Sequence, residues 1–228
     1  SGPGGRDFTA ITASVDLTHS QLDLAEFGWT KKYDAPAKGT FRYGKGNEGA
    51  ILTGDIRADG LELVGEGRMD SAGVFQTADI ERLFSRDRVD LRGMLRRRQD
   101  GGYKLVLNGP FFDASPWMDS LLSMSNANTD MHGEPVGAPA NPGPAVDIQL
   151  TADKLRLREN AEMTAAKVVM LVDADGPRNG TVTGQLGKDK SLNVTIDTVN
   201  KVRKVSIKSD DAGFGARVLL KTDYLIGG

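Results

Sequence analysis

The segment that decides the fold class runs from residue 50 to residue 69 and reads AILTGDIRADGLELVGEGRM. Apolar residues share one parity on each side of the central Asp59-Gly60: Ala50, Leu52 and Ile56 before it, and Leu61, Leu63 and Met69 after it. Polar residues take the other parity: Thr53, Asp55, Arg57, Glu62, Glu66 and Arg68. Alternation with a period of two predicts half-buried strands, and Asp-Gly between two such runs favours a tight hairpin turn. The segment therefore predicts an antiparallel hairpin.

The same alternation extends along the rest of the chain. Its apolar positions are Ile11, Ala13, Val15 and Leu17; Val89, Leu91 and Leu95; Tyr103, Leu105 and Leu107; and Val146, Ile148 and Leu150. Further strands are expected around 163–172, 180–187, 191–197 and 202–208. Strands with one apolar and one polar face are typical of antiparallel sheets rather than of buried parallel ones. The predicted fold is mostly β, a long antiparallel sheet built of strand repeats.

One position interrupts the alternation in the second half. Leu150 belongs to the even parity, whereas Leu155 and Leu157 belong to the odd parity. Because a shift of one residue moves every side chain to the other face, the change predicts a bulge or a turn near Asp153.

Three segments depart from the β pattern in the same way: 77–84, 113–122 and 209–220. Each places Asp or Ser where an N-cap would accept the first free amides of a helix, and each ends in a pair of large apolar residues. We expect two or three short helices that cap the sheet, with Trp117 and Met118 packing the second one against the strands.

The stretch 123–145 carries four prolines among Gly, Asn and Ala: Pro135, Pro139, Pro142 and Pro144. Proline lacks the amide that a strand ladder or a helix interior needs. The expected organisation is a first β-repeat unit at 1–122, a linker at 123–145 and a second β-repeat unit at 146–228. Whether the two units share one continuous sheet is left open at this point.

Composition excludes several classes of protein. The net charge of −2 argues against nucleic-acid binding, which needs clustered surplus Lys and Arg. The absence of cysteine excludes disulfides and thiolate sites. The sequence contains no run of about 18 apolar residues, so it does not predict a transmembrane helix. The glycine-rich start at 1–5 and the strand-like end at 224–228 lead us to expect a segment of a longer protein.

Two motifs with possible chemistry are better explained by structure. Gly39–Gly46 fits most of a phosphate-binding loop, but Gly46 stands where Ser or Thr should hold magnesium, so a glycine-rich hairpin is expected instead. His19 and His132 are the two histidines, and neither has a partner at metal-ligand spacing.

Charged residues give no stronger candidate. Asp55, Glu62 and Glu66 could imitate a glycosidase pair, but a solvated polar face explains them. Arg96–Arg98 could touch anionic lipid headgroups, although a solvated strand tip is the simpler interpretation. We therefore predict a non-catalytic protein, with no catalytic, cofactor-binding or metal-binding residues and no cofactor.

Several local phrases resemble one bacterial family. They are LTHSQLDL (17–24) followed by GWTK (28–31); DIERL (79–83) with DLRG (90–93), DGGY (100–103) and LNGP (107–110); DIQLTADKL (147–155); and SDDAG (209–213) with VLL (218–220). These phrases resemble proteobacterial AsmA-like proteins, especially the YhdP-like branch with its conserved-unknown and AsmA-like C-terminal regions. The resemblance covers nearly the whole chain outside 123–145 and rests on the style of the repeats.

The resemblance implies a fold and a role. Proteins of this family are anchored in the inner membrane by an N-terminal helix and extend through the periplasm. Their long, curved β-sheet carries phospholipid on its apolar face. By this resemblance the chain is a periplasmic segment implicated in phospholipid transport between membranes or in outer-membrane maintenance, with acyl chains and other envelope proteins as partners.

The alternative interpretation is a non-catalytic structural scaffold of the cell envelope. Such a scaffold would bind another envelope protein through the edge of its sheet.

Overall fold

The computed structural model describes residues 9–24, 29–116, 118, 143–174, 176–188, 190–199, 202–211 and 213–215. These residues are mostly β, which confirms the predicted fold class. Their strands are β1 (Thr9–Asp16), β2 (Leu22–Leu24), β3 (Trp29–Lys31), β4 (Ala37–Gly46), β5 (Gly49–Ala58), β6 (Leu61–Met69), β7 (Phe75–Ser85), β8 (Val89–Arg97), β9 (Tyr103–Asp113), β10 (Val146–Arg158), β11 (Ala161–Asp173), β12 (Gly176–Leu186), β13 (Lys190–Val199) and β14 (Val202–Ser209). The chain divides into two compact units, unit 1 (Ser1–Arg97) and unit 2 (Arg98–Gly228).

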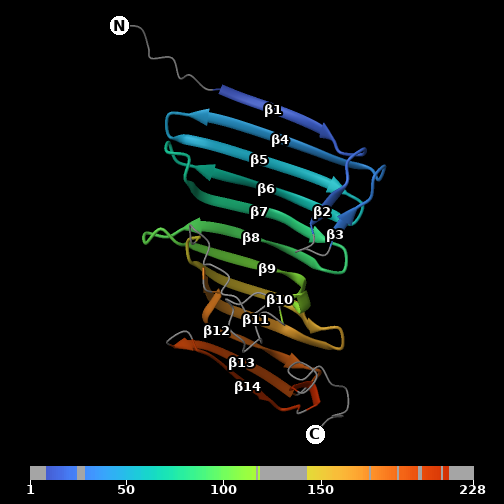
Figure 1. Cartoon of the computed structure of the whole chain (residues 1–228), viewed down its shortest axis with the longest axis vertical. Helices are drawn as coiled ribbons and strands as arrows, with labels where there is room; N and C mark the ends of the chain where they lie inside the picture. Colours follow the sequence, from blue (N-terminus) through green and yellow to red (C-terminus); the bar gives the residue numbers. More distant parts are fainter. Residues whose placement is uncertain are drawn as a thin grey trace, which may run out of the picture. The chain divides into compact units, whose positions relative to one another are not determined.

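The main sheet of unit 1 has six described strands in the order β1-β4-β5-β6-β7-β8, and every neighbouring pair is antiparallel (Figure 1). Strands β2 and β3 pair with each other in a separate two-stranded sheet. The Asp59-Gly60 turn joins β5 to β6, and Gly60 has the positive φ of 73° that such a turn requires. The hairpin predicted from residues 50–69 is confirmed.

The helix predicted at 77–84 is wrong, because this segment lies inside strand β7. The pairing of β7 with β8 shifts between Ile80 and Leu83, as does its pairing with β6 between Val64 and Gly65. A bulge inserts one extra residue and so places side chains three apart on the same face. Ile80 and Leu83 therefore imitate the spacing of a helix while the backbone stays extended.

Unit 2 holds six strands in the order β9-β10-β11-β12-β13-β14. Its last four pairings are antiparallel, but β9 and β10 run parallel, so the prediction of a purely antiparallel sheet is wrong here. A parallel pair needs a long crossover between its strands, and the stretch from 114 to 145 supplies one. The strand β9, which precedes the proline-rich stretch, groups with the strands that follow it. Of that stretch the structure describes 143–145 alone.

The change of parity near Asp153 is real. Ala152 and Leu155 are both buried, at 1% exposure each, although they have opposite parity. The register of β10 with β9 and β11 is unchanged through this point. The irregularity lies in β11, where Ala165 has a positive φ of 49° and the pairing with β12 shifts between Thr164 and Lys167. The predicted bulge is thus on the neighbouring strand, next to Asp153.

Helical residues occur in two of the three predicted places: Ser115, Pro116 and Met118, and 213–215. The Asp113 carboxylate accepts a hydrogen bond from the Ser115 amide at 2.9 Å, and the Asp211 carboxylate accepts one from the Phe214 amide at 2.9 Å. These carboxylates satisfy amides at the helix starts, as N-caps do. The remainder of both predicted helices lies outside the described residues.

Candidate functional site

The register of the strands collects most of the apolar side chains of unit 1 on one face. Residues directly opposite each other in neighbouring antiparallel strands point to the same side, so the pairings assign every face. The apolar face of unit 1 consists of Ile11, Ala13, Val15, Ala37, Phe41, Tyr43, Ala50, Leu52, Ile56, Leu61, Leu63, Met69, Ala78, Ile80, Leu83, Val89, Leu91 and Leu95. The alternation in the sequence therefore becomes one surface that crosses six strands.

Glycines and aromatic rings shape this face. A Cβ on Gly39 would lie 3.0 Å from the Phe41 ring, and a Cβ on Gly54 would lie 3.8 Å from it. On β6, a Cβ on Gly67 would lie 2.5 Å from the Phe75 ring. The rings thus rest close to the backbone, over positions that lack a side chain. The result is an apolar surface of low relief.

One end of the apolar face is covered and the rest is half-exposed. A single row of opposed positions crosses the covered end. In this row Ala37, Leu61, Ser85 and Val89 are buried, and Ala58 is half-buried. Most other positions of the face are half-buried or exposed, such as Leu52 at 38%, while Ala50 and Leu91 are buried. The apolar surface of unit 1 is therefore accessible along much of its length.

The β2–β3 hairpin provides the cover. Figure 1 shows it lying over the end of the sheet where β5 turns into β6. The indole of Trp29 is 8% exposed, and its Nε1 donates a hydrogen bond at 3.0 Å to the carbonyl oxygen of Asp59 in that turn. An amphipathic Trp buries its ring while its N–H finds an acceptor. Trp29 therefore fastens the hairpin to the sheet.

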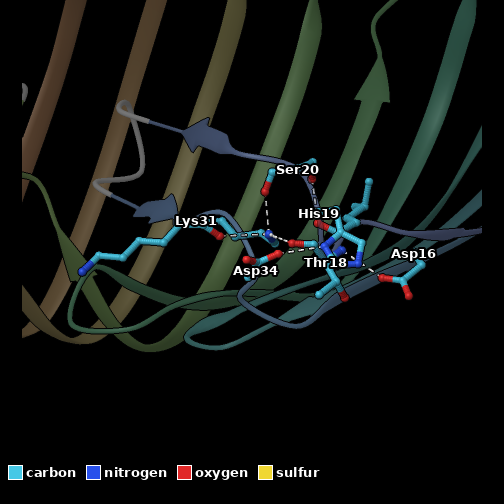
Figure 2. A network of polar contacts seen from close by, with 8 residues as sticks. Asp16, Thr18, His19, Ser20, Lys31 and Asp34 are labelled. Carbon is cyan, nitrogen blue, oxygen red and sulfur yellow. Dashed lines mark hydrogen bonds and ion pairs between the residues drawn. The ribbon is translucent and has the colours of Figure 1, made fainter.

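A buried lysine fixes the same hairpin to the loop that follows β1. Lys31 is 2% exposed, and its ammonium donates to the carbonyl oxygens of Thr18 at 2.8 Å, Ser20 at 2.6 Å and Lys32 at 3.0 Å. Figure 2 shows these contacts converging on the Lys31 nitrogen. Three acceptors match the three N–H donors of an ammonium, which satisfies a charge withdrawn from water. No sequence pattern predicts this cage, since lysine on a short strand is normally exposed.

His19 lies at the periphery of this network. Its Nδ1 lies 2.8 Å from the Asp34 carboxylate, and both side chains are largely exposed (Figure 2). The hydroxyl and amide of Thr18 lower the pKa of the neighbouring Asp16 carboxyl. No group of three metal-ligating side chains occurs among the described residues, and His132 lies outside them.

Unit 2 also has an apolar face, and more of its apolar side chains are buried than in unit 1. Its apolar face includes Leu105, Leu107, Ile148, Leu150, Ala152, Leu155, Leu157, Met163, Ala166, Val168, Met170, Val182, Leu186, Leu192, Val194, Ile196, Val205 and Ile207. Met118 and Phe214, from the two helical segments, are 7% and 4% exposed and belong to the same buried cluster. The predicted packing of the second helix holds for Met118, while Trp117 lies outside the described residues.

The polar face of unit 1 carries ion pairs. Asp55 pairs with Arg57 at 2.9 Å, and Glu66 pairs with Arg68 at 3.0 Å. Glu62 lies 3.6 Å from Arg82. Each carboxylate considered as a glycosidase candidate thus has a guanidinium neighbour on the solvated face.

Two other sequence motifs lie in strands or at a strand end. Gly39–Gly46 falls within β4, followed by the turn at 47–48 into β5, as expected for a hairpin. Arg96–Arg98 lies exposed at the end of β8, and Arg98 pairs with Asp100 at 2.5 Å. Gly44 and Gly46 line a pocket of unit 1 together with Glu48, Ala50, Arg68 and Asp70.

Comparisons with known proteins add no relative. No family model, curated protein or solved structure matches this chain. Within the described residues, no helix has the length and apolarity needed to cross a membrane. The register and the exposure of its side chains therefore make the apolar face of unit 1 the candidate functional site.

Proposed function

We propose that this chain is a periplasmic segment of an AsmA-like envelope protein that carries phospholipid acyl chains on its apolar β-face. One observation carries the proposal: six neighbouring strands of unit 1 turn their apolar side chains to the same face, and much of that face is half-exposed. The resemblance of the local phrases to that family supplies the cellular context.

The size of the face supports a lipid-sized ligand. Six strands spaced about 4.8 Å apart, each about ten residues long at about 3.3 Å per residue, give a face of roughly 24 by 33 Å. The corresponding area of roughly 800 Å² is that of the whole face, including the end that the β2–β3 hairpin covers. The uncovered remainder is long enough to take an extended acyl chain.

The chemistry of the face suits acyl chains and not a polar ligand. All charged residues of β5 and β6 lie on the opposite face: Asp55, Arg57, Glu62, Glu66 and Arg68. Each methylene that leaves water contributes about 0.8 kcal/mol, so chains can bind without directional contacts. Over Gly54 and Gly67 an extended chain would lie against the Phe41 and Phe75 rings, which are apolar.

Extraction of the purified chain with organic solvent, followed by mass spectrometry, tests the proposal. We expect phospholipid to co-purify in a reproducible ratio to protein. Consistent absence of co-purified phospholipid, together with failure of the chain to take up phospholipid from vesicles, would contradict the proposal.

A second candidate is the partner-binding scaffold, which one observation favours. Strand β1 lies at an edge of its sheet with residues 10–16 exposed. Recovery of a stoichiometric envelope protein without lipid would favour this function over lipid carriage.

A further inference from the structure

Two charged residues share the apolar face of unit 1, and both lie at its uncovered end. Lys45, near the end of β4, lies opposite Ala50 and therefore on the apolar side of the sheet. Arg97, at the end of β8, follows Leu95 by two residues and so lies on the same side. In Figure 1 the arrowheads of β4 and β8 point away from the β2–β3 hairpin. The other positions that the register assigns to this face in the described strands are uncharged.

Neither cation has an acidic partner within the part of unit 1 that the structure describes. Lys45 and Arg97 are exposed, and no ion pair or hydrogen bond joins either side chain to another described residue. On the polar face, by contrast, Arg57 and Arg68 each pair with a carboxylate of their own strand. The ammonium and the guanidinium on the apolar side can therefore bind an anion without breaking an internal pair.

The turns at the uncovered end contribute two carboxylates, those of Glu48 and Asp70. Both residues line the pocket that includes Arg68, a residue of the polar face. The Asp70 carboxylate also accepts hydrogen bonds at 2.9 Å from the amides of Ala72 and Val74. These carboxylates thus belong with the polar side of this end, and the two cations belong with the apolar side.

The covered end is unsuited to a charged group. The Lys31 ammonium donates all three of its hydrogen bonds to carbonyl oxygens, and Arg86 pairs with Asp59 at 2.6 Å. Leu61 and Val89 are buried in the row beneath the hairpin. An ionised phosphate placed among such side chains would lose its hydration without gaining a partner, which is costly.

We propose that the apolar face binds a phosphate-bearing lipid lengthwise, with the phosphate at the Lys45 and Arg97 end and the acyl chains directed toward Trp29. This inference rests on the proposed lipid carriage and adds the charge and the orientation of the ligand. Lys45 lies eight residues after Ala37 of the covered row, roughly 26 Å along β4. One layer of acyl chains fills half of the hydrocarbon core of a bilayer, or about 15 Å. An acyl chain therefore fits between the two cations and the hairpin while the phosphate stays in water.

Quenching of Trp29 fluorescence by brominated phospholipids tests the orientation. A Trp117→Phe background makes Trp29 the sole tryptophan. At equal occupancy, bromine near the methyl end of the acyl chain should cause a larger loss of Trp29 emission than bromine near the carbonyl end. Saturable binding with equal quenching, or with the reverse order, overturns the orientation while lipid carriage stands. Absence of saturable binding overturns both.

Charge reversal at the two ends of the face tests the phosphate contact. Lys45→Glu acts at the uncovered end, and the matched control Lys32→Glu acts in the loop after the hairpin; both lysines are exposed, so neither change should unfold the chain. Lys45→Glu should raise the dissociation constant for phosphatidylglycerol about fivefold, which corresponds to roughly 1 kcal/mol for one Lys near an anionic lipid surface, and Lys32→Glu should change it little. Diacylglycerol with the same acyl chains lacks the phosphate and should bind both variants equally. Equal effects of the two variants on phosphatidylglycerol, or the same loss with diacylglycerol, overturn the phosphate contact.

Discussion

Replacement of Lys31 by methionine tests whether the carbonyl cage holds the β2–β3 hairpin over the apolar face. Methionine keeps most of the length of the side chain but removes the ammonium. The carbonyl oxygens of Thr18, Ser20 and Lys32, now 2.6–3.0 Å from that nitrogen, lose their shared donor. The hairpin then keeps the Trp29 contact to the β5–β6 turn as its main polar attachment.

The expected loss of stability follows from these contacts. A hydrogen bond to a charged group contributes about 1.5–3 kcal/mol, and the cage contains three. Thr18 and Ser20 are only partly buried, so water can replace part of the lost bonding, and the methionine gains apolar burial. We therefore expect the free energy of unfolding of unit 1 to fall by about 2–4 kcal/mol. The matched control Lys32→Met changes an exposed side chain and should stay within about 0.5 kcal/mol.

Urea unfolding followed by Trp29 fluorescence measures this difference. The chain has two tryptophans, so a Trp117→Phe background makes Trp29 the sole reporter. Equal midpoints and slopes for Lys31→Met and Lys32→Met would refute the cage as a stabilising contact.

Three further changes test other parts of the structure. Gly67→Ala should lower the free energy of unfolding by about 1–3 kcal/mol, because its Cβ would lie 2.5 Å from the Phe75 ring. In the control Gly54→Ala the Cβ would lie 3.8 Å from the Phe41 ring, and this substitution should be tolerated. Similar melting temperatures for the two variants would contradict this account. Hydrogen bonding from Arg156 lowers the pKa of Glu162, so this carboxylate stabilises unit 2 above the ordinary pKa of Glu, and the stabilisation is lost as the pH falls through the lowered value. Glu162→Gln should therefore cost up to about 1 kcal/mol at pH 7 and less at pH 3, and a pH-independent difference would speak against the pair. Leu155→Ala, at a position 1% exposed, should cost about 2–5 kcal/mol by chemical denaturation, and a loss below 1 kcal/mol would show that the core is not packed there.

The alternation of apolar and polar residues with a period of two predicts most of the fold. The parities of residues such as Leu52, Leu63 and Leu91 predict which side chains share a face, and the register confirms it. This works because strand geometry alone fixes the face of a side chain, whatever its neighbours are.

The errors occur where a local pattern has two physical solutions. At Ile80 and Leu83 a bulge gives the spacing that a helix would also give, and only the pairing with β6 and β8 decides between them. The parallel pairing of β9 with β10 depends on where a long crossover returns, which side-chain alternation does not encode.

The candidate site was predictable as a face but not in its details. The apolar stripe follows from alternation, whereas the cover over its end depends on Trp29 and Lys31 in a three-residue strand. A strand that short leaves too few alternating positions to recognise, and two of the three acceptors of Lys31 come from a loop 11 and 13 residues earlier.

Binding of a fluorescent phospholipid to two charge variants tests the central claim most directly. Leu52 and Ile51 are adjacent on β5 and almost equally exposed, at 38% and 37%, but they lie on the apolar and the polar face respectively. The account predicts that Leu52→Glu raises the dissociation constant by about tenfold or more, equivalent to about 1.4 kcal/mol, while Ile51→Glu leaves it nearly unchanged. Equal effects of the two substitutions, or no saturable binding by the unaltered chain, would contradict the assignment of lipid to the apolar face.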